Sequence, residues 1–353
     1  MTTSLPTPPL NILIAGAGVC GPILALMLQR SNPNHTITVV ERYPTLRTGG
    51  QQIDLKDEGI LIMKKLGLLE TIRAYCVKES GMEFVDRNGK SLMQFGITGA
   101  GEKAGALTLT NEFEFMRGDF VDMVHGISVR EREILVANGC VRSSLTYEFN
   151  KSIAAVAHSD TPSLSTTSTV TFSTGETGTY DLVVAADGQA SRTRSLAFGR
   201  DISAESFYSL NIHAAYYNIP RLPHEDSLAR MYFAPSARMV LTRTGDRPLT
   251  QVYLFLMNGK NKDRADHMAT MQKRSPHNQK NAWKTMFADA GWDCLRFLEG
   301  LDGVTDFYAT EIGQVKMPEQ NLHRNRVVLL GDAGYCPSPF TGMGTTLSLI
   351  GAR

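Results

Sequence analysis

Residues 12–21 read Ile-Leu-Ile-Ala-Gly-Ala-Gly-Val-Cys-Gly, and residues 22–30 continue Pro-Ile-Leu-Ala-Leu-Met-Leu-Gln-Arg. The apolar run before the first glycine is typical of a buried parallel strand, and the run that starts with proline predicts a helix. Gly16 permits a tight turn, Gly18 lets the backbone approach a phosphate, and Gly21 lets the helix pack on the strand. The stretch therefore predicts a turn whose helix N-terminus binds the pyrophosphate of a dinucleotide.

A second predicted strand, residues 36–40, ends at Glu41. Glu41 lies 20 residues beyond Gly21, the spacing at which an acidic side chain accepts hydrogen bonds from a ribose hydroxyl. Arg42 follows, and two roles stay open for it: closing over the adenosine or lying in solvent. Residues 12–28 carry no charge, but their glycines and proline argue against a signal peptide or a membrane-spanning helix, so we expect no membrane segment.

Two later glycine–aspartate pairs also end predicted buried strands. Residues 180–186 lead into Asp187-Gly188, and residues 326–330 lead into Gly331-Asp332. Ligands of open parallel sheets bind beyond the carboxyl ends of the strands, so both pairs point to the ligand of the first turn. Each signal is weak alone, but together they fit one flavin adenine dinucleotide (FAD). A plain NAD(P) dehydrogenase is disfavoured because it has no need for the last pair.

Antiparallel segments interrupt this α/β pattern. Residues 82–86 and 91–95 flank an Asn88-Gly89 turn and predict a hairpin, and at least four alternating strands between residues 211 and 257 predict a half-exposed antiparallel sheet. The expected fold class is α/β, a Rossmann-like FAD-binding domain with an inserted antiparallel substrate domain. We expect a disordered tail over residues 1–10, the FAD-binding domain over 11–75, 104–190 and 306–353, and the substrate domain over 76–103 and 191–305.

Composition narrows the class of protein further. A formal net charge of +1 over 353 residues excludes an electrostatically driven nucleic-acid binder. The 42% hydrophobic content allows one large core or two modest ones. Five cysteines are scattered without metal-ligand spacing, so we expect reduced thiols, no metal site and a cytoplasmic location. Nothing in the sequence indicates the oligomeric state.

Taken in order, these motifs resemble those of the class A flavoprotein monooxygenases, the superfamily of para-hydroxybenzoate hydroxylase. The resemblance runs from Ile12 to the last residue and includes Arg117, within Glu-Phe-Met-Arg-Gly-Asp-Phe-Val at 114–121. The chain is more closely similar to the tetracycline-inactivating flavin monooxygenases and to related fungal and actinobacterial hydroxylases of polycyclic metabolites. No single motif is specific, but the combination is.

The resemblance implies which residues hold the cofactor. The glycine turn and Glu41 would hold the ADP half, Asp187-Gly188 would serve both FAD and the reduced pyridine nucleotide, and Gly331-Asp332 would bind the ribityl and pyrophosphate portion. A loop of backbone amides over 339–344 suits the pyrimidine edge of the flavin. The implied cofactor-binding residues are Gly16, Gly18, Gly21, Glu41, Arg42, Gly50, Arg117, Asp187, Gly188, Asp332, Gly342, Gly344 and Thr345.

The resemblance also implies substrate-facing positions on the antiparallel sheet. His213 and Arg238 match strand positions that touch substrate in the tetracycline-inactivating branch, with His213 where glutamine is more usual. Strand alternation lets only one of Tyr216 and Tyr217 face the flavin. The candidate catalytic residues are His213, Arg238 and Tyr217, and the alternative is that these polar residues face solvent.

The implied activity is FAD-dependent monooxygenation of an aromatic or enolic small molecule, in fungal polyketide or other secondary metabolism. NADPH would reduce FAD, and O2 would supply the oxygen atom. The protein would exclude water, place the substrate carbon and favour its phenolate or enolate form. Arg238 as a cation, or neutral His213 as a base, would assist that ionisation.

Two features depart from the family pattern. Tyr335 stands where the family commonly has histidine, and the helix predicted from Thr345 ends at Arg353, where relatives continue. Two alternative functions therefore stay open: a flavin-dependent oxidase or rearrangement enzyme, and a truncated, non-catalytic accessory protein. The substrate and the choice between NADH and NADPH are not fixed by the sequence.

Overall fold

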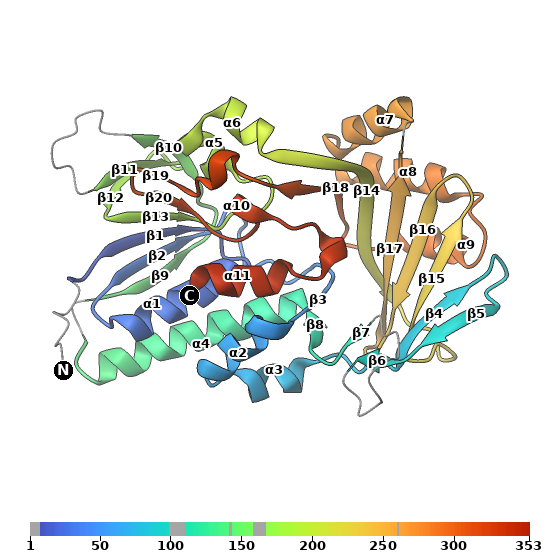
Figure 1. Ribbon diagram of the computed structural model, residues 1–353, viewed down its shortest axis with the longest axis horizontal. Helices are drawn as coiled ribbons and strands as arrows, with labels where there is room; N and C mark the ends of the chain where they lie inside the picture. The colour runs from blue at the N-terminus through green and yellow to red at the C-terminus, as the bar shows by residue number, and fades with distance from the viewer. Residues whose placement is uncertain (1–7, 99–109, 141–142, 158–166, 260) are drawn as a thin grey trace.

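Figure 1 shows a computed structural model of the chain, in which a parallel sheet with its helices lies beside a large antiparallel sheet. The structure describes residues 8–98, 110–140, 143–157, 167–259 and 261–353. The predicted tail over residues 1–10 lies mostly outside the described residues. Among the described helices, none combines the length and the hydropathy that crossing a bilayer requires.

The first sheet has six strands in the order β19-β20-β13-β1-β2-β9, and all its pairs are parallel except β19-β20. Its strands are β1 Asn11–Ala15, β2 Thr36–Val40, β9 Leu145–Glu148, β13 Leu182–Ala185, β19 His323–Arg324 and β20 Val327–Leu329. The central strand β1 is apolar on both faces because both faces are covered. This sheet confirms the predicted Rossmann-like unit.

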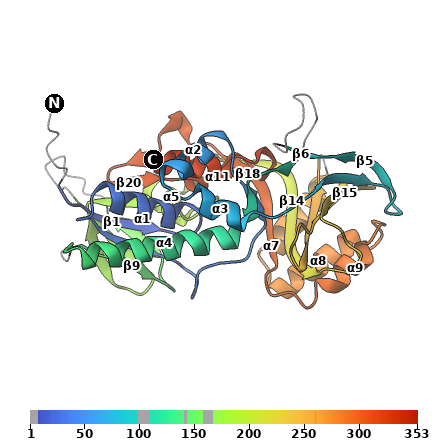
Figure 2. The same cartoon turned by 90° about the horizontal axis from the view of Figure 1, so that it is seen from below.

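Helices cover one face of the parallel sheet, and a small antiparallel sheet and one short helix, residues 192–198, pack against the other. Figure 2 shows α1 and α4 side by side along the parallel sheet. The helices of this half are α1 Cys20–Ser31, α2 Asp57–Lys65, α3 Leu69–Tyr75, α4 Arg117–Ala137, α5 Arg192–Phe198, α6 Arg200–Glu205, α10 Asp332–Tyr335 and α11 Gly344–Ala352. The small sheet consists of β10 Ile153–Ala157, β11 Ser168–Phe172 and β12 Thr177–Tyr180.

The large sheet has seven strands in the order β18-β14-β17-β16-β15-β4-β5. Its strands are β4 Gly81–Val85, β5 Ser91–Phe95, β14 Phe207–Pro220, β15 Leu228–Ala234, β16 Arg238–Arg243, β17 Leu249–Met257 and β18 Tyr308–Val315. All pairs are antiparallel except β4-β15, which is parallel. Helices α7 Lys262–Gln272, α8 Pro276–Phe287 and α9 Cys294–Gly300 lie together on one side of it (Figure 2).

Two expectations about the large sheet need correction. We expected it to be half exposed, but the middle strands β16 and β17 are buried on both faces, because α7–α9 cover one face and a second apolar cluster occupies the other. We assigned residues 306–353 to the FAD-binding domain, but β18 hydrogen-bonds to β14 at the edge of the large sheet. The remaining domain boundaries stay predictions.

Short elements connect the two halves. A two-stranded ribbon, β3 Gln52–Asp54 paired with β8 Glu114–Met116, lies between the parallel sheet and the large sheet. The remaining elements are β6 Ile97–Thr98, β7 Thr110–Asn111 and the 3-10 turns η1 Pro318–Gln320 and η2 Pro339–Thr341. The ribbon matters for function because residues of β3, and Arg117 directly after β8, line the candidate site.

Candidate functional site

The glycine turn after β1 is packed too tightly for other residues. Gly16 has a φ of +111°, and a Cβ there would lie 2.5 Å from the carbonyl oxygen of Ala186 at the end of β13. A Cβ on Gly21 would lie 2.0 Å from the carbonyl oxygen of Gly16. Helix α1 begins at Cys20, inside the motif and two residues before the predicted start at Pro22, because Val19 already has helical dihedrals.

Gly18 differs from the other two glycines, because it has room around it. The nearest atom to a Cβ built there is Nη2 of Arg117, at 3.4 Å. The Glu41 carboxylate reaches the same turn and accepts a hydrogen bond of 2.9 Å from the backbone N–H of Ala17. A cradle of backbone beside a helix N-terminus is therefore open to an anion, with an acidic side chain next to it.

Arg117 closes this part of the site from the N-terminus of α4. Its Nη1 donates to the carbonyl oxygens of Arg47 at 2.9 Å and Gly49 at 3.2 Å. Burial lowers the pKa of Arg117, with a further lowering from nearby Arg47. Among the described residues no carboxylate forms an ion pair with its guanidinium. A buried cation that lacks an acidic partner fits an anionic ligand such as the FAD pyrophosphate.

Asp187, after β13, is held by its own loop. Its carboxylate accepts hydrogen bonds from the backbone N–H of Thr193 at 3.0 Å and from the Thr193 hydroxyl at 2.9 Å. Arg194, one residue on, is buried and joins this loop to the last one: Nη1 donates to Ala333 O at 2.8 Å and Nη2 to Gln189 O at 3.0 Å. Sequence reasoning missed Arg194 because an arginine in a short helix normally indicates a solvated face.

The last glycine–aspartate pair lies against the first turn. Gly331 has a φ of +62°, and a Cβ there would lie 2.3 Å from Sγ of Cys20. Burial raises the pKa of the Asp332 carboxyl, while a hydrogen bond with Cys336 and the charge of Arg117 oppose that rise. Burial also raises the pKa of Cys336 to about 12, which disfavours the thiolate that a nucleophile requires.

These loops converge on one cleft of about 500 Å³. Of the residues that we predicted to bind the cofactor, only Gly21 does not line it, because it packs beneath the turn. The lining includes Gly16, Gly18, Glu41, Arg42, Gly50, Arg117, Asp187, Gly188, Asp332, Gly342, Gly344 and Thr345. Segments from both ends of the chain thus form a single elongated site that fits a dinucleotide, although the contacts of each residue with FAD stay predictions.

The far end of the cleft is aromatic. Tyr216 from β14 and Tyr308 from β18 line it, with ring centroids 6.1 Å apart. Tyr253 and Phe255 of β17 pack against Tyr216 at 5.1 and 5.9 Å. Phe340, in the loop that leads to Gly342, packs on Phe255 at 5.6 Å. The large sheet therefore presents an aromatic face to the loops that hold the cofactor residues.

Our three candidate catalytic residues do not lie in this cleft. Tyr217 points to the opposite face of β14, where its hydroxyl donates to Phe297 O at 3.0 Å. His213, on the same face, is 1% exposed and lies 2.8 Å from the Asn258 amide through Nδ1. Arg238 donates to Met286 O at 2.7 Å and pairs with Asp289. The strand register turns all three toward the layer formed by α7–α9 and away from the cleft, and their catalytic role stays a prediction.

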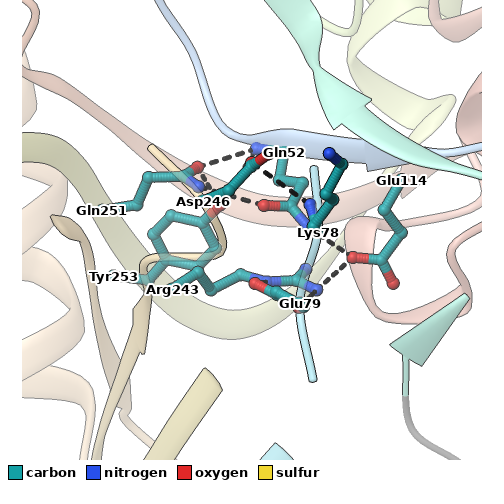
Figure 3. A network of polar contacts seen from close by, with 8 residues as sticks. All are labelled: Gln52, Lys78, Glu79, Glu114, Arg243, Asp246, Gln251 and Tyr253. Atoms are coloured by element: carbon teal, nitrogen blue, oxygen red, sulfur yellow. Dashed lines mark hydrogen bonds and ion pairs between the residues drawn. The ribbon is translucent and has the colours of Figure 1, made fainter. Parts of the chain in front are cut away.

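A buried polar network, also missed by sequence reasoning, joins the ribbon to the large sheet (Figure 3). Arg243 of β16 donates through Nε to Glu79 at 2.8 Å and through Nη2 to Glu79 at 2.5 Å, and Nη2 also donates to Glu114 of β8. Gln52 of β3 donates to Glu114 and accepts a 3.0 Å hydrogen bond from Gln251. Charged residues in alternating strands resemble a solvated face, so no sequence signal identified them.

Comparisons with known proteins agree with this geometry. The sequence pattern of a family described as FAD binding domain matches residues 10–352. The FAD-dependent monooxygenase asL6 of Sarocladium schorii is 35% identical and is matched over 97% of this chain and 78% of that protein. The FAD-dependent monooxygenase asL4 of the same organism is 31% identical, over 98% and 74%. The crystal structure of tetracycline destructase Tet(51) superposes with a TM-score of 0.76 at 26% identity, covering 98% of this chain and 80% of that one.

Proposed function

Because this chain belongs to the FAD-binding-domain family and is an FAD-dependent monooxygenase, we propose that it transfers an oxygen atom from O2 to an aromatic or enolic carbon of a small molecule, with NAD(P)H as reductant. When bound and reduced, FAD supplies the reaction with dioxygen. The residues that would hold it are those of the three loops around the cleft, with Arg117 beside the pyrophosphate. The protein contributes binding, orientation and the exclusion of water.

The observation that carries this proposal is the aromatic end of the cleft. Tyr216 and Tyr308 form its wall, and Phe255 packs against Tyr216 behind it. Aromatic side chains bind flat, apolar rings through large contact areas and offset stacking. A substrate ring held here would lie between the large sheet and the loops that hold the cofactor. A polyketide-type aromatic or enolic molecule fits this chemistry, and the proposal places the reaction in fungal secondary metabolism.

Tyr216 favours hydrogen-bond donation over base catalysis. Burial raises the pKa of its phenol, and the neighbouring Tyr253 and Tyr308 raise it further. The group therefore stays protonated at neutral pH and donates a hydrogen bond to an oxygen of the substrate. This role replaces the one that we expected for Tyr217 on the other face of the strand.

The proposal also covers how NAD(P)H reaches the flavin and in which compartment the protein works. The described residues form only one dinucleotide-binding turn of this type, so we propose that NAD(P)H visits the cleft transiently instead of occupying a second nucleotide fold. All five cysteines are free, which suits a reducing compartment such as the cytoplasm.

One experiment tests the proposed reaction. NADPH and NADH oxidation is screened against phenolic and polycyclic polyketides, and the substrate that stimulates it is then converted under oxygen-18 gas. Label in the product supports oxygen transfer. An unlabelled product would instead establish one of the alternatives. An oxidase forms one hydrogen peroxide per oxidised product without consuming NAD(P)H, and a rearrangement enzyme forms an isomer of the substrate without net oxidation.

A further inference from the structure

In the buried network of Figure 3, one guanidinium is shared by two carboxylates. The Arg243 side chain is 12% exposed, and the two carboxylates that share it, Glu79 and Glu114, are 4% and 8% exposed. One guanidinium therefore holds two carboxylates away from water. The Arg243 cation stabilises this arrangement, because buried carboxylates without it repel one another and are poorly solvated.

The network joins the large sheet to the wall of the cleft. Arg243 belongs to β16, and its partner Glu114 belongs to β8, directly before Arg117. Gln52 of β3 donates to Glu114, and its backbone N–H donates to the Tyr253 hydroxyl at 2.9 Å. Each strand of the ribbon is therefore tied to the sheet by at least one buried hydrogen bond.

The same ribbon continues into the cofactor site. The backbone N–H of Arg117 donates to Gln51 O at 3.2 Å, and a Cβ on Gly50 would lie 3.0 Å from Cδ of Arg117. Gly50, Gln51 and Gln52 all line the cleft. A shift of the ribbon relative to the sheet would therefore move this wall and the Arg117 guanidinium together.

We propose that Arg243 is a positioning residue, which holds Glu79 and Glu114 in place and thereby fixes the Gly50–Gln52 segment and Arg117 along the FAD cleft. The proposal depends on FAD binding and not on the identity of the substrate. Arg243 lies outside the cleft lining, so its effect on the cofactor passes through the ribbon. The bidentate geometry toward Glu79 explains why arginine and not lysine suits the position.

The chain offers a matched control. Arg230 of β15 pairs with Glu83 of β4, with Nε to Oε2 at 2.9 Å and side chains 24% and 12% exposed. Arg230 pairs in register with Thr242, so it points to the opposite face of the sheet from Arg243. Its ion pair ties two strands of the large sheet together without contacting the ribbon.

The test compares Arg243→Met, Arg243→Lys and Arg230→Met in the full chain. Each apoprotein is titrated with FAD, the visible circular dichroism of the bound flavin is recorded, and thermal unfolding of the apoprotein is measured. We expect Arg243→Met to weaken FAD binding about tenfold and to change the flavin spectrum. Arg243→Lys should fall between it and the wild type, and Arg230→Met should lower the unfolding temperature without changing FAD affinity or spectrum.

Two results would overturn the proposal: wild-type FAD affinity and spectrum in Arg243→Met, or the same change in Arg230→Met. If Arg243→Met does not fold, Arg243→Lys and Glu114→Gln answer the question. Arg243→Lys keeps a cation but loses the bidentate geometry, and Glu114→Gln keeps Arg243 but removes one carboxylate charge from the cluster. An altered flavin spectrum in either folded variant supports the proposal, and wild-type affinity and spectrum in both refute it. A failure to convert any substrate would count against the proposed reaction alone.

Discussion

Substitutions at two glycines of the first turn should have different effects, one on the stability of the fold and the other on the affinity for FAD. Gly16 is required by its positive φ and by the approach of Ala186 O, so Gly16→Ala should destabilise the apoprotein by more than about 2 kcal/mol. Gly18 has no such constraint, so Gly18→Ala should change apoprotein stability by less than about 0.5 kcal/mol. It should nevertheless weaken FAD binding at least about tenfold, because the methyl group fills the cradle. Urea unfolding and FAD titration check both variants, and equal effects would contradict the distinction.

His213 should make stability depend on pH. Burial lowers its pKa from 6.5, so below about pH 6.5 the unfolded chain binds this proton more readily than the folded chain. The free energy of unfolding should therefore fall as the pH drops below 6.5 and stay level above it. His213→Gln should reduce this slope by up to about 1.4 kcal/mol per pH unit. His35 and His125, whose pKa values burial also lowers, should leave a residual slope.

Chemical denaturation of both proteins between pH 5 and 8 measures that difference. Parallel curves for the wild type and His213→Gln would show that His213 has the same proton affinity in both states.

The sequence predicted the role of a residue correctly where the backbone geometry allows only one residue type. Glycines at Gly16 and Gly331 are readable because no other side chain fits the close approach. The sequence did not predict the buried roles of Arg194 and Arg243. A buried arginine cannot be distinguished from a solvated one in the sequence, because its partners are distant in the chain.

At the scale of elements, neighbouring side chains of strand β14 point to opposite faces of the sheet, so Tyr216 and Tyr217 should have different roles. Tyr217→Phe removes a hydrogen bond to Phe297 O within the layer of α7–α9, so we expect a loss of about 1 kcal/mol of unfolding free energy and an unchanged flavin spectrum. Tyr216→Phe should change the flavin spectrum or substrate affinity instead, because Tyr216 lines the cleft. The opposite assignment of effects would mean that the register of β14 is shifted by one residue.

Helices α5 and α10 are coupled through Arg194. Arg194→Met would leave the carbonyl oxygens of Ala333 and Gln189 without their donor, so we expect a loss of about 3 kcal/mol in unfolding free energy and weaker FAD binding. Urea denaturation of the apoprotein and a flavin titration measure the two effects. A stable variant with wild-type FAD affinity would show that the two glycine–aspartate loops are positioned independently.

Element types were predictable from the sequence, but their environment was not. The strands of β14 to β17 and the hairpin of β4 and β5 lie where alternation and the Asn88-Gly89 turn predicted them. Periodicity could not show that β4 pairs in parallel with β15, or that both faces of β16 and β17 are covered. The wrong placement of His213, Tyr217 and Arg238 has the same cause, because a face is assigned only when the packing layer is known.

At the scale of the whole molecule, the chain leaves the parallel sheet, builds the large sheet up to its edge strand β18, and returns to the parallel sheet through β19 and β20. Three loops far apart in sequence therefore meet at one cleft, as the order of their motifs predicted. The aromatic face of the large sheet closes the other end. In the proposed reaction the two halves have different roles: the loops would hold the cofactor, and the large sheet would place the substrate.

The most direct measurement of this account is an equilibrium titration of the apoprotein with FAD and, separately, with FMN. We propose that the glycine turn and Glu41 bind the ADP half of FAD. FMN keeps one phosphate but lacks the adenosine monophosphate portion. We predict one FAD bound per chain and FMN binding at least about a hundredfold weaker. Equal affinity for the two flavins, or no binding of either by the folded chain, would contradict the convergence of these loops on FAD.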